Sequence, residues 1–231
     1  MSSDHSIDKS EVVEYYDIIA DKYDESRFNN SYGRFIDAEE RKILNQLIDV
    51  DQNSLRLEMA CGTGRLTNYA THGLDASNEM LNIARKRYDN IEFRHASATE
   101  TGYDDACFDI VYSFHLLMHL DKQTIRDIFE ESNRILKPNG RFIVDIPSAE
   151  RRNLLHHKQT SWHGATHLSK QELSDIAGDK FTLNRSFGIM MLPVHHLPES
   201  IRRMLQTLDY ALANGWLKKY ASYVVYEFVK K

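Results

Sequence analysis

The chain of 231 residues has only two cysteines, no long apolar run and no large excess of charge of one sign. Cys61 and Cys107 provide no disulfide framework, which is typical of proteins in a reducing cytoplasm. No apolar stretch approaches the roughly 20 residues that a membrane helix needs. Residues 1–10 are polar and lack the apolar segment of a secretory signal. We therefore expect a cytoplasmic protein without an integral membrane segment.

The charges exclude a further class of partner. The formal net charge is -5, from 29 Lys and Arg against 34 Asp and Glu, and the two signs are interspersed. Basic residues adjoin in short runs such as the pair Arg151-Arg152. Proteins that bind a phosphate backbone usually concentrate Lys and Arg on one face, so we expect no nucleic-acid partner. The composition does not indicate an oligomeric state.

Hydrophobic residues make up 42% of the chain, enough for one large core. Two helical patterns, at residues 12–23 and 35–48, precede any convincing strand. Strands and helices then alternate, and such repeats favour a parallel sheet because parallel neighbours need crossover connections. The expected strands are residues 55–59, 73–75, 91–95, 108–114, 141–146, 181–189 and 221–229. The expected helices of this part end at Tyr69 or cover residues 78–88, 121–136, 169–177 and 199–213.

A glycine loop follows the first expected strand, in the segment LEMACGTGRL at residues 57–66. Gly62 and Gly64 let the backbone approach a ligand closely. A helix that begins directly after them would present free N–H groups to an anion. In an open α/β sheet, ligands bind at this carboxyl end of the strands. The spacing differs from G-x-G-x-x-G, which disfavours a nicotinamide dehydrogenase.

This loop resembles motif I of the class I S-adenosylmethionine (SAM)-dependent methyltransferases, acid-x-Gly-x-Gly-x-Gly, with Ala60 in place of the first glycine. Three later segments resemble family motifs in the same order: GLDASNEML at 73–81, FDIV at 108–111 and RILKPNGRF at 134–142. Tyr15, Tyr16, Asp17, Ala20, Tyr23 and Asp24 resemble the family's N-terminal cap helix. The resemblance covers about residues 12–146, and the last expected strand fits the family's antiparallel seventh strand.

The fold expected from both lines of reasoning is α/β. It is a Rossmann-like doubly wound sheet, mostly parallel with an antiparallel last strand, with helices on both faces and an N-terminal helical cap. We expect the cap in residues 1–50 and the SAM-binding core in residues 51–231. Cover segments over the site are expected near residues 148–168 and 190–219. The short step from Gly64 to Asp75 requires a first crossover helix of about two turns.

The resemblance implies that SAM is the cofactor. Glu58 would face its ammonium group, Asp75 would bind both ribose hydroxyls, and Ser97 would occupy the adenine position. The cofactor-binding residues expected in this way are Tyr16, Tyr23, Glu58, Ala60, Cys61, Gly62, Gly64, Asp75, Ala76, Met80, Ser97, Ala98, Phe114 and His115. Tyr16 and Tyr23 are equally compatible with simple packing of the cap on the sheet.

Methyl transfer from a sulfonium is an in-line displacement, for which a protein supplies position, desolvation and sometimes a base. His115 and His119 follow the fourth expected strand, in the loop that borders the sulfonium in this family. As neutral imidazoles they are candidate catalytic bases, although His119 in particular also suits a structural role. We expect Trp162 and His163 to bind the substrate. His163 and His167 lack further ligands, so we expect no metal site.

The sequence thus predicts a SAM-dependent methyltransferase that acts on an oxygen or nitrogen atom of a small-molecule acceptor. A quinone-like or lipid-linked acceptor is the first alternative. A SAM-binding accessory protein without methyl transfer is the second. The sequence does not identify the acceptor.

Overall fold

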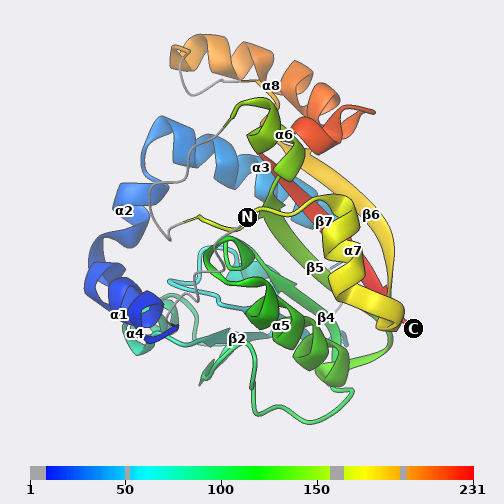
Figure 1. Ribbon diagram of the computed structural model, residues 1–231. Helices are drawn as coiled ribbons and strands as arrows, with labels where there is room; N and C mark the ends of the chain where they lie inside the picture. The colour runs from blue at the N-terminus through cyan, green and yellow to red at the C-terminus, as the bar shows by residue number, and fades with distance from the viewer. Residues whose placement is uncertain (1–8, 50–52, 157–163, 193–196) are drawn as a thin grey trace.

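The computed structural model describes residues 9–49, 53–156, 164–192 and 197–231 (Figure 1). Its centre is a seven-stranded sheet with the order β3-β2-β1-β4-β5-β7-β6. The strands are β1 (Arg56–Met59), β2 (His72–Asp75), β3 (Glu92–His95), β4 (Phe108–Ser113), β5 (Leu136–Pro147), β6 (Phe181–Ile189) and β7 (Tyr223–Lys230). The first five are parallel, and β7 is antiparallel to both β5 and β6.

Most helices begin at a side chain that accepts a hydrogen bond from the backbone of the first turn. Asn30, Ser77 and Asp121 do so before α3, α4 and α5, and Ser169 forms a capping box with Glu172 before α7. The α-helices are α1 (Lys9–Ile19), α2 (Tyr23–Arg27), α3 (Ser31–Leu47), α4 (Asn78–Arg87), α5 (Lys122–Ile135), α6 (Ala149–Leu154), α7 (Lys170–Ala177) and α8 (Glu199–Asn214). Short 3₁₀ turns are η1 (Ala20–Lys22), η2 (Thr67–Tyr69), η3 (Leu117–His119), η4 (Gly178–Lys180) and η6 (Lys218–Tyr220).

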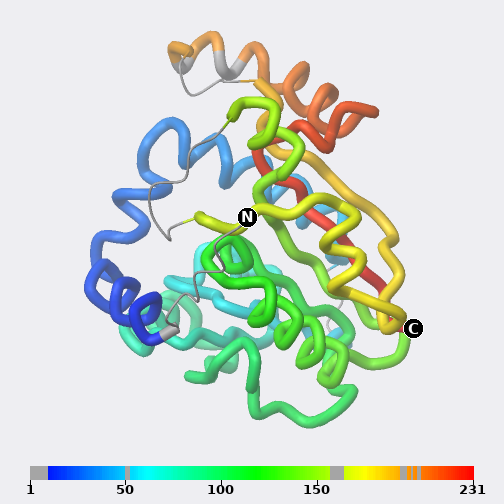
Figure 2. Tube along the Cα trace, in the orientation of Figure 1, coloured from blue at the N-terminus to red at the C-terminus, as the bar shows by residue number. Residues whose placement is uncertain are grey.

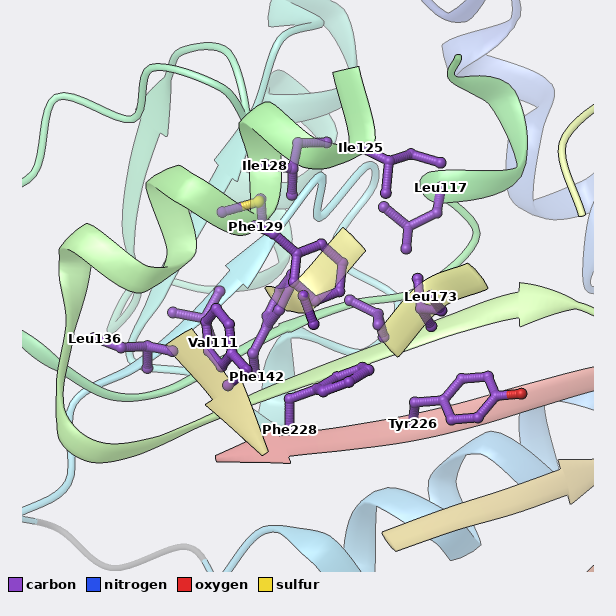
Figure 3. Close-up of a cluster of buried hydrophobic side chains, with 14 of the residues drawn as sticks. Val111, Leu117, Ile125, Ile128, Phe129, Leu136, Phe142, Leu173, Tyr226 and Phe228 are labelled. Atoms are coloured by element: carbon purple, nitrogen blue, oxygen red, sulfur yellow. The ribbon is translucent and has the colours of Figure 1, made fainter. Parts of the chain in front are cut away.

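The alternation of side chains along the strands divides the core into two layers. On one face, α5 and α7 cover a cluster in which Phe129 packs edge-to-face on Phe142 and Phe228, with ring centroids 5.0 and 5.3 Å apart (Figure 3). Each such ring pair contributes about 0.5–1.5 kcal/mol beyond its buried area. On the other face, Ile43 and Leu44 of α3 belong to the second buried cluster.

The N-terminal helices reach the sheet from one side (Figure 2). Helix α1 contacts α4, whereas α3 packs against the sheet and belongs to its core. Asp17 and Asp24 attach α1 and α2 to the segments that follow β2 and β1. The Ser77 hydroxyl donates to Asp17, and the Thr63 hydroxyl donates to Asp24 at 2.7 Å. The chain from α1 to α2 is therefore held over the carboxyl ends of β1 and β2.

The predicted fold class, with its mostly parallel sheet and antiparallel last strand, is confirmed. Two local predictions are wrong. The expected first crossover helix is a single 3₁₀ turn, η2, because the few residues before β2 leave no room for an α-helix. The expected helix at 12–23 is divided into α1, η1 and α2. Among the described helices, none has both the length and the apolar character needed to cross a membrane.

Candidate active site

A cavity of about 610 Å³ lies at the carboxyl ends of β1, β2 and β4, beside α1. Its volume is within the range typical of small-molecule sites. The structure brings most of the predicted cofactor residues to its wall: Tyr16, Tyr23, Ala60, Gly62, Asp75, Ala76, Met80, Ser97, Ala98, Phe114 and His115. His119, a predicted catalyst, also lines it. Glu58, Cys61 and Gly64 do not, although all three were expected to bind the cofactor.

The glycine loop and Asp75 form one hydrogen-bonded unit. The Asp75 carboxylate accepts the Gly62 N–H at 2.7 Å and the Ser77 N–H at 2.8 Å. Gly62 has a φ of 54°, in the left-handed region that glycine adopts without strain, and Ala60 has a φ of 56°. Because only η2 follows this loop, the expected helix of about two turns with an anion-binding start is absent at this position. The loop amides and Asp75 themselves shape this end of the cavity.

Glu58 is the predicted site residue with the most unexpected environment. Its side chain is buried beneath the loop, where the Thr67 hydroxyl donates to it. Burial raises the pKa of Glu58 to about 8, with the Thr67 hydrogen bond acting in the opposite direction. At neutral pH the group is therefore largely a neutral acid. This position does not support the expectation that a Glu58 carboxylate faces an ammonium group in the cavity.

His115 follows β4 and adopts a left-handed conformation with a φ of 60°. Its Nε2 lies 2.6 Å from Glu40 Oε1, and its Nδ1 lies 3.6 Å from Asp145 Oδ2. Burial would lower the pKa of His115, but the charges of Glu40 and Asp145 outweigh burial and raise it. A raised pKa favours the protonated imidazole, which cannot accept a proton from an acceptor. The environment therefore disfavours His115 as the neutral base that the sequence suggested.

The ion pairs around His115 continue into the glycine loop. Arg65 lies 2.7 Å from Glu40 and 2.6 Å from Asp37 of α3. Burial raises the pKa of Glu40, but Arg65 and His115 together lower it to about 2. Glu40, His115 and Asp145 have ligand-type atoms within 4.8 Å of one another. Because Arg65 already pairs with Glu40, the charges of this cluster are compensated within the protein.

His119 has a different hydrogen-bond pattern. Its Nδ1 accepts the Gly164 N–H at 3.1 Å, and its Nε2 lies 3.1 Å from the Tyr16 hydroxyl. Since Nδ1 accepts a hydrogen bond, the neutral ring carries its proton on Nε2 and donates it to the Tyr16 oxygen. The Tyr16 side chain lines the cavity. His119 thus sets the orientation of a hydroxyl group at the cavity wall.

Several site residues were missing from the sequence prediction. Glu40 and Asp145 are buried beside His115, and Asp17, Ser77 and Leu116 line the large cavity. A signal for two of them was present: Asp145 interrupts the apolar strand FIVDIP, and Glu40 lies between inward-facing Ile36 and Ile43 of α3. The predicted substrate residues Trp162 and His163 lie outside the described residues.

A doubly wound sheet with a glycine loop after β1 and an acid at the end of β2 forms a ligand site at the carboxyl ends of the strands. Residues 57–144 match the model of a family described as a methyltransferase domain. A solved structure described as a SAM-dependent methyltransferase, possible histamine N-methyltransferase, from Thermotoga maritima has the same fold. Its TM-score is 0.71 at 20% identity, covering 95% of this chain and 99% of that one.

Curated relatives carry similar descriptions. A demethylmenaquinone methyltransferase of Thermotoga maritima is 32% identical over 146 residues, which are 59% of this chain and 61% of that protein. A ubiquinone/menaquinone biosynthesis C-methyltransferase of Brucella anthropi is 30% identical over 153 residues, 60% of this chain and 49% of that protein. The chain thus spans about half the length of the curated relatives it matches. Residues 57–144 therefore match a methyltransferase domain, and these comparisons bear out the resemblance to the class I SAM-dependent methyltransferases.

Proposed function

We propose that this protein transfers a methyl group from SAM to an oxygen or nitrogen atom of a small-molecule acceptor. The observation that carries the proposal is the cavity at the carboxyl ends of β1, β2 and β4, where the glycine loop, Asp75 and the cap helix α1 meet in a methyltransferase domain. The Asp75 carboxylate has about four lone-pair sites, so accepting two loop N–H groups leaves capacity for ribose hydroxyls.

Bound SAM supplies a methyl group already activated by its sulfonium charge. The acceptor atom forms the new bond to carbon as the carbon–sulfur bond breaks, the electron pair of that bond stays on sulfur, and the acceptor's proton leaves to water or a side chain. The protein's part is to align the reactants and to exclude water. Phe114, Leu116 and Leu120 give the cavity wall the apolar character that this requires.

Incubation with methyl-labelled SAM and a fractionated metabolite extract tests the proposal. We expect a labelled small molecule with the wild-type protein and much less with Asp75→Ala. Label found only in macromolecules would contradict a small-molecule acceptor. Tight SAM binding without transfer to any acceptor would instead support an accessory protein.

A quinone-like acceptor is the second candidate, because two of the relatives above are described as acting in quinone biosynthesis. A reduced naphthoquinone lacking the ring methyl group is a direct probe. Label recovered in this compound would favour the second candidate. Label in aqueous-soluble products alone would favour the first.

A further inference from the structure

A second, smaller cavity of about 110 Å³ adjoins the large one. Tyr16, Tyr23, His115 and His119 line both cavities, so these four side chains form their shared wall. The remaining wall of the small cavity comes from α2, α3 and β7, with Phe28, Tyr32 and Tyr223 among its residues. The small cavity is thus next to the place where the proposed function requires an acceptor.

Six aromatic rings follow one another around the small cavity. The order is His119, Tyr16, Tyr23, Phe28, His115 and Tyr223. Neighbouring ring centroids are 6.0, 5.8, 5.9, 6.2 and 5.7 Å apart along this order. Four of the five pairs are edge-to-face, the arrangement in which the positive ring edge meets the negative ring face. A further flat ring can continue such an array.

The size of the small cavity agrees with a single ring. An apolar protein cavity of about 150 Å³ is known to bind benzene, and the volume here is comparable. A bulky polycyclic or strongly hydrated group would not fit within it.

The charges in the wall select among ring-sized ligands. Arg27 and His115 both line the small cavity, whereas Glu40 and Asp145 line neither cavity. Burial raises the pKa of Tyr23 to about 12, while the positive charges of Arg65 and Arg27 act in the opposite direction. The raised pKa of Tyr23 favours a neutral hydroxyl group on a ring bound here, and the Arg27 guanidinium in the wall opposes a bound ammonium group.

We propose that the small cavity binds the ring of a phenolic acceptor, with its hydroxyl group directed toward the wall shared with the large cavity. This inference rests on the proposed function, because it assigns the acceptor of that same site. The hydroxyl oxygen would lie beside the Tyr16 hydroxyl, which His119 orients. The inference differs from the sequence expectation, which located acceptor binding at Trp162 and His163.

Binding of small probes tests the inference directly. Phenol, cyclohexanol and tetramethylammonium are titrated against the full chain by ligand-detected NMR, with S-adenosylhomocysteine present. We expect phenol to bind roughly tenfold more tightly than cyclohexanol, because only phenol gains ring–ring contacts. Equal binding of the two alcohols, or preferred binding of tetramethylammonium, would overturn the inference.

Phe28→Leu and Tyr32→Leu each remove one ring while retaining an apolar side chain. Each is expected to weaken phenol binding by roughly three- to tenfold and to leave cyclohexanol within about twofold. Trp216→Leu is the matched control, because Trp216 is 88% exposed and lines neither cavity. A phenol preference that survives both ring removals would overturn the inference.

The same titrations separate this inference from the proposed function. If S-adenosylhomocysteine binds but phenol shows no preference, the phenolic site fails and the proposed function stands. If S-adenosylhomocysteine does not bind but the ring-dependent phenol preference is present, the proposed function fails and the aromatic site stands. The affinity for S-adenosylhomocysteine also reports whether each variant is folded.

Discussion

At the scale of single residues, the Asp75 carboxylate connects the two loops that shape the large cavity. It accepts N–H groups from Gly62 after β1 and from Ser77 before α4. Burial raises the pKa of Asp75, and these backbone hydrogen bonds act in the opposite direction by favouring its ionised form. Asp75 therefore both supports the glycine loop and offers oxygen atoms to a ligand.

We expect Asp75→Ala to weaken SAM binding by roughly 10- to 100-fold, because hydrogen bonds to a charged group are worth about 1.5–3 kcal/mol. Titration calorimetry measures the change. Asp179→Ala, at an exposed acid in η4, is the control. Equal SAM affinities for wild type and Asp75→Ala would show that Asp75 does not contribute to the cofactor site.

The raised pKa of Glu58 predicts that the stability of the folded protein depends on pH. Its pKa is about 8 in the folded protein against 4.5 as the ordinary value. Because its pKa is raised in the folded state, Glu58 makes a contribution to the free energy of unfolding. This contribution is fully present below pH 4.5 and is lost as the pH rises through 8. Between these values the wild type should lose stability relative to Glu58→Gln, on the order of a few kcal/mol.

Urea unfolding of wild type and Glu58→Gln at several pH values checks this difference. The glutamine retains an oxygen that can accept from Thr67, so the comparison isolates the ionisation. Glu100→Gln, at an exposed position after β3, should leave the pH dependence unchanged. Parallel pH profiles for wild type and Glu58→Gln would contradict a raised pKa.

At the scale of elements, Gly33 allows α3 to begin directly against the end of α2. A Cβ atom at this position would lie 2.0 Å from the Arg27 carbonyl oxygen and 2.6 Å from Phe28 Cα. Gly33 also donates its N–H to Asn30, the N-cap of α3, at 2.8 Å. The close approach fixes α2, and with it Phe28, at the edge of the small cavity.

We expect Gly33→Ala to lower the free energy of unfolding by about 1–3 kcal/mol, because the clash with backbone atoms outweighs the helix propensity of alanine. Denaturant unfolding measures it. Asn45→Ala, exposed in the same helix, should be neutral or slightly stabilising. A gain in stability for Gly33→Ala would mean that α2 moves away at no cost.

Elements also show where sequence reasoning succeeds. The apolar runs of β1, β4 and β5 and the Asp121 cap of α5 are local signals, and the structure has these elements in the expected places, although β5 begins at Leu136, before the expected range 141–146. The helical period of α1 continues into α2, but nothing in that period indicates the break at η1. The short step from Gly64 to Asp75 correctly predicted a short first crossover. The prediction of a two-turn helix there was wrong, because the crossover contains the 3₁₀ turn η2.

At the scale of the whole molecule, ligand binding and stability are linked. SAM at about 100 times its dissociation constant should stabilise the fold by about 2.7 kcal/mol, which corresponds to a rise in Tm of roughly 5–10 °C. Thermal unfolding with SAM, and with NAD at the same concentration, measures this effect. A rise with NAD that equals the rise with SAM would contradict the proposed cofactor.

The sequence by itself determined the parallel sheet, the glycine loop and the acid at the end of β2, because periodicity and spacing are local properties of the chain. Only the tertiary structure decided which charges surround His115, since Glu40 and Asp145 come from α3 and β5. The aromatic rings around the small cavity likewise come from residues as distant in the sequence as Tyr16 and Tyr223. Such contacts depend on how helices and strands pack, which no local pattern encodes.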